Sequence, residues 1–88
     1  MKEYHLRITT PAGDAFDGQV TQLSVRGIMG DLAIMTGHIP FVTTLKDTEN
    51  NVRIYFADKG SKIATCTGGL LTVSKETVQL LATEIHWQ

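Results

Sequence analysis

The sequence predicts an all-β fold, a small sandwich or barrel of short strands that forms one domain over residues 1–88. Apolar side chains recur at every second position along most of the chain, which is the period of a strand with one buried face. Glycine, proline, serine and aspartate interrupt this alternation at short intervals, as they do between the strands of sandwiches and barrels. No segment of helical length carries an apolar stripe with a period of about 3.6 residues, so we expect no helix.

The first quarter of the chain predicts two strands joined by a tight turn. Residues 4–9 alternate between apolar and polar side chains, and residues 10–14 contain a proline and a glycine that favour a turn. The next apolar set changes its spacing, because Val20 and Leu23 are three positions apart. This change of phase predicts a bulge or bend near residues 21–22.

The middle of the chain predicts two strands between loops. Residues 27–30 form a loop bounded by glycines, residues 31–35 alternate again, and residues 36–40 are rich in turn-forming side chains. Residues 41–45 have the composition of a strand. The polar residues 46–51 that follow are expected to form a surface loop.

The second half of the chain shows the most regular alternation. Residues 52–57 alternate, and residues 58–61 have the composition of a hairpin turn. Three further alternating segments follow, separated by two glycines and by polar turn residues, at 63–67, 71–73 and 78–82. For Trp87, near the end of the sequence, two alternatives stay open: it packs on the sandwich or it faces a partner.

The composition excludes several classes of protein. Hydrophobic residues make up 42% of the sequence, which is too much for a disordered chain. Eight Lys and Arg residues against nine Asp and Glu residues give a net charge of -1, which argues against a nucleic-acid-binding surface. The first residues show no signal-peptide pattern, and no segment approaches the roughly 20 apolar residues of a membrane span. We therefore expect any membrane association to be indirect.

The titratable side chains show no pattern of a catalytic, cofactor-binding or metal-binding site. His5, His38 and His86 are far apart and share no metal-ligand spacing with each other or with Cys66. Cys66 is the only cysteine, so it forms no internal disulfide, and we expect a buried, inert thiol in a reducing compartment. The expectation is a protein that is not an enzyme and that needs no cofactor.

Turn chemistry accounts for two acidic residues and several glycines. Asp14 and Asp17 lie in or beside a turn, where an aspartate usually accepts hydrogen bonds from local backbone amides. The glycines at positions 27, 30 and 37 have the wrong spacing for a nucleotide-binding loop. Ile28 and Met29 differ, because they are apolar residues at the tip of a loop. From the local sequence, core burial and an exposed docking contact are equally favoured for them.

One segment, residues 27–40, reads GIMGDLAIMTGHIP and resembles the pattern G-x-x-G-[DE]-L-x-I-x-x-G-H-x-P of the epsilon subunit of F-type ATP synthases. Residues 10–20, 68–73 and 78–82 resemble other parts of that family in the same order, so the resemblance extends over residues 4–83. Each piece is weak alone, but four pieces in register are specific. Ala33 stands where the family frequently has glycine, which is a mild departure.

The resemblance implies a fold and a role. The fold is a β-sandwich of about ten short, mostly antiparallel strands. The role is that of a central-stalk subunit that holds the gamma subunit and rests on the polar loops of the membrane-embedded c-ring. Rotation driven by ion flow passes through this joint to catalytic sites on other subunits. The resemblance further implies a peripheral place on the cytoplasmic face of a bacterial cell membrane, and we expect a monomer when the chain is isolated.

The resemblance also implies which residues make these contacts. The positions that face the gamma subunit are Thr10, His38 and Thr43. The positions that face the c-ring are Ile28, Met29, Gly30 and Asp31. In this loop the apolar side chains supply contact area, and the Asp31 carboxylate supplies an acceptor for an Arg, Gln or Asn side chain of the ring.

Family members commonly continue into a pair of C-terminal helices that can inhibit ATP hydrolysis and, in some cases, bind ATP. This sequence reaches Gln88 without such a pattern, so we assign neither property to it. The main alternative is a stand-alone β-sandwich module that binds a small ligand or a carbohydrate, although its aromatic residues are only 7% and scattered. A small hydrolase ranks third, because the sequence lacks a nucleophile paired with a base.

Overall fold

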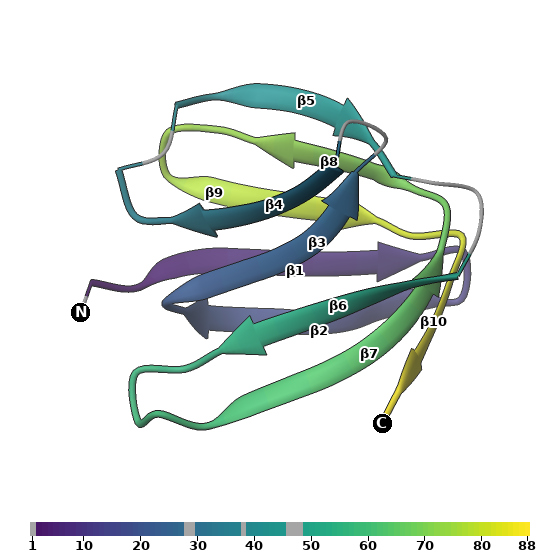
Figure 1. Cartoon of the computed structure of the whole chain (residues 1–88), viewed down its shortest axis with the longest axis horizontal. Helices are drawn as coiled ribbons and strands as arrows, with labels where there is room; N and C mark the ends of the chain where they lie inside the picture. Colours follow the sequence, from purple (N-terminus) through teal and green to yellow (C-terminus); the bar gives the residue numbers. More distant parts are fainter. Residues whose placement is uncertain (1, 28–29, 38, 46–48) are drawn as a thin grey trace.

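The computed structural model describes residues 2–27, 30–37, 39–45 and 49–88, and these residues form ten strands and no helix. Two five-stranded sheets lie face to face (Figure 1), so the predicted all-β sandwich is confirmed. Within the described ranges there is thus no helix that could cross a membrane. The strands are β1 (Tyr4–Thr10), β2 (Gly13–Val20), β3 (Gln22–Gly27), β4 (Gly30–Met35), β5 (Phe41–Thr44), β6 (Glu49–Tyr55), β7 (Ser61–Thr67), β8 (Leu70–Val73), β9 (Thr77–Leu81) and β10 (Glu84–Trp87).

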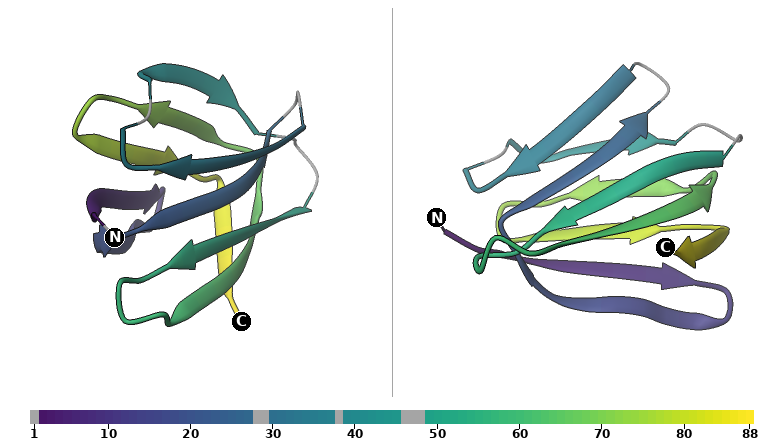
Figure 2. Two further views of the ribbon diagram at one scale, coloured as in Figure 1. Left: turned by 60° about the vertical axis from the view of Figure 1, so that its left-hand side comes forward. Right: turned by 60° about the horizontal axis from the view of Figure 1, so that its bottom comes forward.

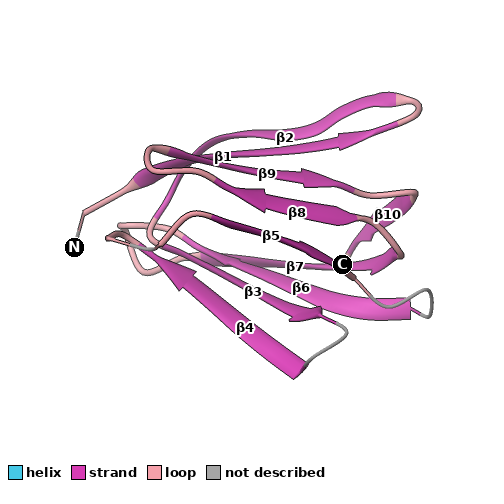
Figure 3. Ribbon diagram, turned by 90° about the horizontal axis from the view of Figure 1, so that it is seen from above, coloured by secondary structure: helices cyan, strands magenta, loops and turns pink. Residues whose placement is uncertain are grey.

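The two sheets are built from alternating parts of the chain. Sheet A has the strand order β2-β1-β9-β8-β5, and sheet B has the order β10-β7-β6-β3-β4. The described pairings are antiparallel, apart from the parallel pair of β1 and β9. Figures 2 and 3 show the layers from other sides, with the β3–β4 hairpin on the side of the sandwich away from β2.

The inner faces of both sheets form the hydrophobic core. On β1, Leu6 and Ile8 are fully buried while Arg7 between them is exposed, which confirms the predicted alternation. On β6, Val52 and Ile54 repeat this pattern from the opposite sheet. Burial of apolar surface stabilises the fold by about 25 cal/mol per Å². The hydrophobic residues with no exposed surface are Leu6, Ile8, Val20, Leu23, Val52, Ile54, Ala64, Leu71 and Leu80.

A bend at Thr21 carries the chain from β2 in sheet A to β3 in sheet B. The Thr21 amide and the Thr21 hydroxyl both donate to the Tyr55 carbonyl, at 2.8 and 3.1 Å. The predicted bend near residues 21–22 is therefore confirmed. A ladder irregularity lies elsewhere, at Ala15 of β2, which has no opposite residue in the register with β1.

Gly69 lies where the chain passes from β7 in sheet B to β8 in sheet A, and its position requires glycine. Its φ is 133°, and a Cβ placed there would lie 2.4 Å from the Leu81 carbonyl oxygen. The preceding Gly68 also has a positive φ, of 61°. The interruption at these two glycines is thus the point at which the strand direction changes from one sheet to the other.

The predicted hairpin turn between β6 and β7 is confirmed. The Phe56 amide donates to the Gly60 carbonyl at 2.9 Å, and the Lys59 amide donates to the Phe56 carbonyl at 3.1 Å. Lys59 accepts a φ of 72° within this turn. The Asp58 carboxylate accepts a hydrogen bond from the Gly60 amide at 2.9 Å, which stabilises the turn further.

Two expectations need correction. The prediction of a surface loop over residues 46–51 is wrong in its second half, because β6 begins at Glu49 and Asn50 is buried; residues 46–48 lie outside the described chain. Strand β10 is absent from the predicted strands. In β10, Ile85 packs against the core while Glu84 and His86 are exposed. This alternation covers only four residues, which is too short for the sequence pattern to indicate a strand.

Three aromatic side chains that are distant in sequence gather at one side of the sandwich. Phe16 lies 6.0 Å from Phe56 and 6.3 Å from Trp87, measured between ring centroids. The ammonium of Lys62 lies 5.2 Å from the Trp87 ring centroid, within the range of a cation–π contact. Trp87 therefore packs on the sandwich, the first of its two alternatives, although 38% of its surface stays exposed. The description of the aromatic residues as scattered is wrong for these three.

Replacing Gly69 with alanine is expected to destabilise the fold more than replacing Gly13. The φ of Gly13, 127°, is close to the 133° of Gly69, but no atom lies within 4 Å of a Cβ added at Gly13. We expect backbone strain of about 1–3 kcal/mol in either variant. Gly69→Ala loses more, because the Leu81 carbonyl has to move. Urea unfolding of both variants measures the difference, and equal free energies of unfolding would contradict it.

Candidate functional site

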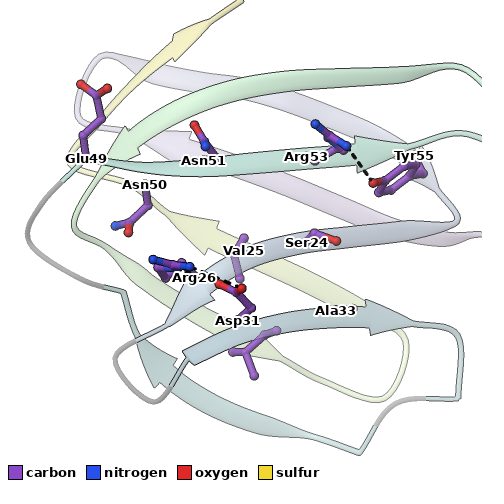
Figure 4. Close-up of a pocket in the computed structure, with 11 residues that line it drawn as sticks. Ser24, Val25, Arg26, Asp31, Ala33, Glu49, Asn50, Asn51, Arg53 and Tyr55 are labelled. Atoms are coloured by element: carbon purple, nitrogen blue, oxygen red, sulfur yellow. Dashed lines mark hydrogen bonds and ion pairs between the residues drawn. The ribbon is translucent and has the colours of Figure 1, made fainter.

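Two of the residues expected to face the c-ring lie at the tip of the β3–β4 hairpin. Gly30 begins β4, pairs with Gly27 and has a φ of 123°, a value that favours glycine. Asp31 follows on the exposed outer face of sheet B. Ile28 and Met29 lie outside the described residues. The hairpin register thus places the described part of the predicted loop at one end of a sheet, as Figure 4 shows for Asp31.

The Asp31 carboxylate already has a partner within this hairpin. Arg26 lies opposite Asp31 in the β3–β4 register, and its Nε donates to Asp31 Oδ1 at 2.8 Å. The hydrogen bond and charge of Asp31 raise the pKa of Arg26. Both side chains are exposed, so the pair contributes little to stability. The Asp31 carboxylate, which was expected to accept a hydrogen bond from a c-ring residue, therefore already accepts one from Arg26.

Thr10 and Thr43, expected to face the gamma subunit, lie on sheet A and are both half-buried. The Thr10 hydroxyl donates to the Gly13 carbonyl at 3.1 Å and accepts from the Ala12 amide at 3.3 Å, which ties it into the β1–β2 turn. Thr43 pairs with the buried Leu71, so its side chain lies on the inner side of the edge strand β5. His38 lies outside the described residues.

A row of residues across sheet A connects the neighbourhoods of these two threonines. In the strand registers Thr9 lies opposite Leu81, Leu81 opposite Leu70, and Leu70 opposite Thr44. Thr10 follows one end of this row and Thr43 precedes the other. The structure therefore brings these two sites to the same end of one sheet, but it separates them by the width of two strands.

Three apolar side chains on the outer face of sheet A were missing from the predicted site. We call Val42, Leu70 and Leu81 the outer apolar row; Leu70 lies opposite Leu81, and Val42, which lies opposite Thr72, is the diagonal neighbour of Leu70. Val42 is 61% exposed, Leu81 is 40% exposed and Leu70 is half-buried. Each of them stands beside another apolar residue, as Phe41-Val42, Leu70-Leu71 and Leu80-Leu81. Since neighbouring side chains of a strand point to opposite faces, each such pair must expose one member. This signal was available in the sequence.

The outer apolar row continues at both ends. Beyond Leu81 lies a hollow of about 360 Å³, lined by Thr9, Thr10, Pro11, Leu81, Ala82 and Thr83. Beyond Val42, the link between β4 and β5 exposes Ile39, at 80%. Met35, which is 50% exposed, belongs to the outer face of sheet B instead, because it alternates with the core-facing Ile34. Contiguous apolar residues exposed on a small domain are typical of protein-docking surfaces.

Several described ionisable side chains form ion pairs on the surface. His5 Nε2 contacts the Asp17 carboxylate, and Arg7 binds Asp14 at 3.1 Å. Asp14 and Asp17 thus bind side chains of β1 across the hairpin, which corrects the expectation that they accept local backbone amides. In the described part of the chain, no three His, Cys, Asp or Glu residues lie close enough to hold a metal ion.

Two buried acids have shifted pKa values. Burial raises the pKa of the Cys66 thiol, and Cys66 is 1% exposed, as expected for an inert thiol. Burial also raises the pKa of the Tyr4 hydroxyl, an effect opposed by a weaker contact with the Leu23 backbone. The Tyr4 hydroxyl donates to the Ile34 carbonyl at 2.7 Å and so joins β1 of sheet A to β4 of sheet B.

Residues 3–88 match the family described as ATP synthase, Delta/Epsilon chain, beta-sandwich domain. The ATP synthase epsilon chain, sodium ion specific, of Acetobacterium woodii is 34% identical over 84 residues, which are 96% of this chain and 62% of that protein. The ATP synthase epsilon chain of Bacillus velezensis is 37% identical over 82 residues, 93% of this chain and 60% of that protein. The chain thus spans about three-fifths of the length of these curated relatives.

Two solved structures share the fold at low sequence identity. A chain of the Euglena gracilis mitochondrial ATP synthase superposes with a TM-score of 0.88 at 16% identity, over 97% of this chain and 53% of that chain. A chain in the central stalk and c-ring structure of the Tetrahymena thermophila mitochondrial ATP synthase gives 0.74 at 17% identity, over 97% and 66%. At these identities the likeness establishes a common fold.

The raised pKa of Cys66 predicts a loss of stability at alkaline pH. In the unfolded chain the thiol has a pKa of about 8.5, whereas burial gives it a higher pKa in the folded chain. The contribution of Cys66 is therefore complete at pH values below the unfolded pKa and is lost as the pH rises through the folded pKa. We expect the urea midpoint to fall between pH 7.5 and pH 9.5, roughly one unit either side of the thiol pKa, and to fall less in Cys66→Ala. Identical pH profiles for the two chains would overturn this.

Proposed function

Because this chain belongs to the ATP synthase delta/epsilon chain β-sandwich family, we propose that it is a non-catalytic subunit of the central stalk of an F-type ATP synthase. The observation that carries the proposal is the family match over residues 3–88. In this role the chain joins the gamma subunit to the c-ring and couples ion translocation to ATP synthesis on other subunits. The two sequence relatives, from Acetobacterium woodii and Bacillus velezensis, are bacterial, which supports a peripheral place on the cytoplasmic face of a bacterial membrane.

We assign the gamma contact to the side of sheet A that carries the outer apolar row. Thr10 follows Thr9, which lies opposite Leu81, and Thr43 follows Val42 on β5 with its own side chain toward the inner face. The exposed Ile39 precedes β5 in the sequence. His38 is assigned to this contact by the family resemblance alone. Apolar contact supplies most of the free energy in such an interface, at about 25 cal/mol per Å² buried, while the threonines and the histidine supply hydrogen bonds and shape. His38 acts mainly as a neutral side chain at pH 7.

We assign the c-ring contact to the tip of the β3–β4 hairpin, with Ile28, Met29, Gly30 and Asp31 as contact residues. This hairpin belongs to sheet B and lies on the side of the sandwich away from β2 (Figure 3). The two contacts are therefore held by different sheets of one packed core. Torque can pass between them without a hinge, because a close-packed interior transmits strain.

Val42→Asp is expected to weaken the gamma contact, because it places a charge in the outer apolar row. The fold should be unaffected, since this side chain is 61% exposed. Ala57→Asp is the matched control, because Ala57 is also apolar and exposed but lies in the turn between β6 and β7. Co-purification of the gamma subunit with each tagged chain measures the effect. Equal recovery of gamma with both variants, and with the unaltered chain, would show that this face is misassigned.

At the ring contact, Met29→Asp is expected to impair coupling more than Asp31→Asn. An apolar side chain loses its whole contact when it becomes charged, whereas Asp31 already shares its carboxylate with Arg26. ATP-driven proton or sodium pumping by membranes that contain each variant measures coupling. If Asp31→Asn uncouples and Met29→Asp does not, the apolar contact is not the main one. If neither has an effect, the hairpin tip is an ordinary surface turn.

A further inference from the structure

The outer face of sheet B carries a hollow of about 590 Å³, drawn in Figure 4. Its floor contains two small side chains in one row, because Ser24 of β3 lies opposite Ala33 of β4 and, on its other side, opposite Arg53 of β6. Residues opposite each other in a ladder point to the same face. The hollow exists because small side chains lie between longer ones, which include Tyr55, Arg26, Asp31 and Asn51.

The pairing between β3 and β6 ends beside this hollow. The ladder joins residues 22–24 to residues 53–55, although β3 continues to Gly27 and β6 already begins at Glu49. The two strands diverge from this point on, which is visible in Figure 4. An extended polypeptide segment that lies in the hollow therefore meets backbone groups of both strands as well as side chains.

Arg53 differs from the other two arginines of the sequence. Arg7 binds Asp14 and Arg26 binds Asp31, each across its own hairpin. Arg53 has the Tyr55 hydroxyl at 3.5 Å from its Nη1, and within the described ranges it forms no ion pair with a carboxylate. Its guanidinium therefore stands at one wall of the hollow with most of its donors unused.

We propose that this hollow binds an aspartate or glutamate side chain carried on an extended segment of another ATP synthase subunit, with Arg53 as the residue that binds the carboxylate. The inference rests on the proposed function in one respect, the identity of the partner as a subunit of that enzyme. It adds a third contact, on the face of the sandwich opposite to the outer apolar row.

The chemistry of the hollow selects a single carboxylate over other anions. A guanidinium matches the two oxygens of a carboxylate in a planar, bidentate geometry. Ser24 and Asn51 line the same hollow and offer additional donors. Asp31 and Glu49 also line it, and their negative charges disfavour a polyanion such as nucleic acid. One carboxylate beside Arg53 is compatible with these acids, because Asp31 is already paired with Arg26 and Glu49 lies at the start of β6, four positions from Arg53.

Carbodiimide coupling in the assembled enzyme tests this proposal. Arg53→Lys keeps the positive charge and provides an amine. A water-soluble carbodiimide activates a touching carboxylate, which the amine then attacks to form an amide, and the carbodiimide takes up the elements of water and leaves as a urea. Mass spectrometry then identifies the coupled residue. Arg53→Gln has no amine at this position and is the negative control, while the native Lys75, in the turn between β8 and β9, reports background coupling.

Coupling of position 53 to an Asp or Glu of another subunit supports the proposal. Coupling only to Asp31 or Glu49 of the same chain or to a second copy of it, or no coupling, overturns it. We also expect Arg53→Gln to bind the complex about tenfold more weakly, as for the loss of a charge-assisted hydrogen bond, while Lys75→Gln binds normally. If the unaltered chain never co-purifies with stalk subunits, the proposed function fails first and the inference fails with it. If the chain assembles with stalk subunits but position 53 of the Arg53→Lys variant does not couple to any of them, the inference is wrong and the proposed function stands.

Discussion

The structure depends on the burial of two apolar sheet faces against each other. Neither sheet can exist alone in water, because each exposes a row of Leu, Ile and Val side chains on its inner face, such as Leu6 and Leu80 in sheet A and Ile54 in sheet B. This requirement fixes the phase of every strand, since a shift by one residue would turn the apolar set outward. It also explains the special backbone at Gly69, where the chain must leave one sheet and enter the other within a residue or two.

The same constraint determines where binding surfaces can arise. One side chain in two is committed to the core, so any apolar residue beyond that number has to face outward, and Val42 and Leu81 are such residues. The outer faces also carry ion pairs, of which Arg26–Asp31 is one. Along each strand, the inward-facing positions are fixed by packing in the core. The outward-facing positions that alternate with them remain available for contacts with other molecules. This arrangement is compatible with the proposed role, in which the chain holds several neighbours rigidly.

Alternation in the sequence predicted the strands whose inner faces are long enough to repeat, such as β1 and β6. It could not reveal β10, where Ile85 packs inward between two exposed polar residues, or the start of β6, where the polar Asn50 is buried. Contacts between distant segments were also inaccessible, because the meeting of Phe16 with Trp87 depends on how two sheets are stacked. The site residues at the β3–β4 tip came from family resemblance, and the partnership of Asp31 with Arg26 became visible only when the register was known.

The parallel pairing of β1 with β9 has a consequence for the order in which the protein is made. The two strands are neighbours in the middle of sheet A, but His5 meets Thr77 and Thr9 meets Leu81, so most of the chain separates them. During synthesis, the edge of β1 that pairs with β9 therefore stays open until β9 has left the ribosome. Contacts between residues so far apart in sequence make folding slow. In that interval the hairpin of β1 and β2 is a half-finished sheet, and Leu6 and Ile8 are the side chains that a chaperone would meet first.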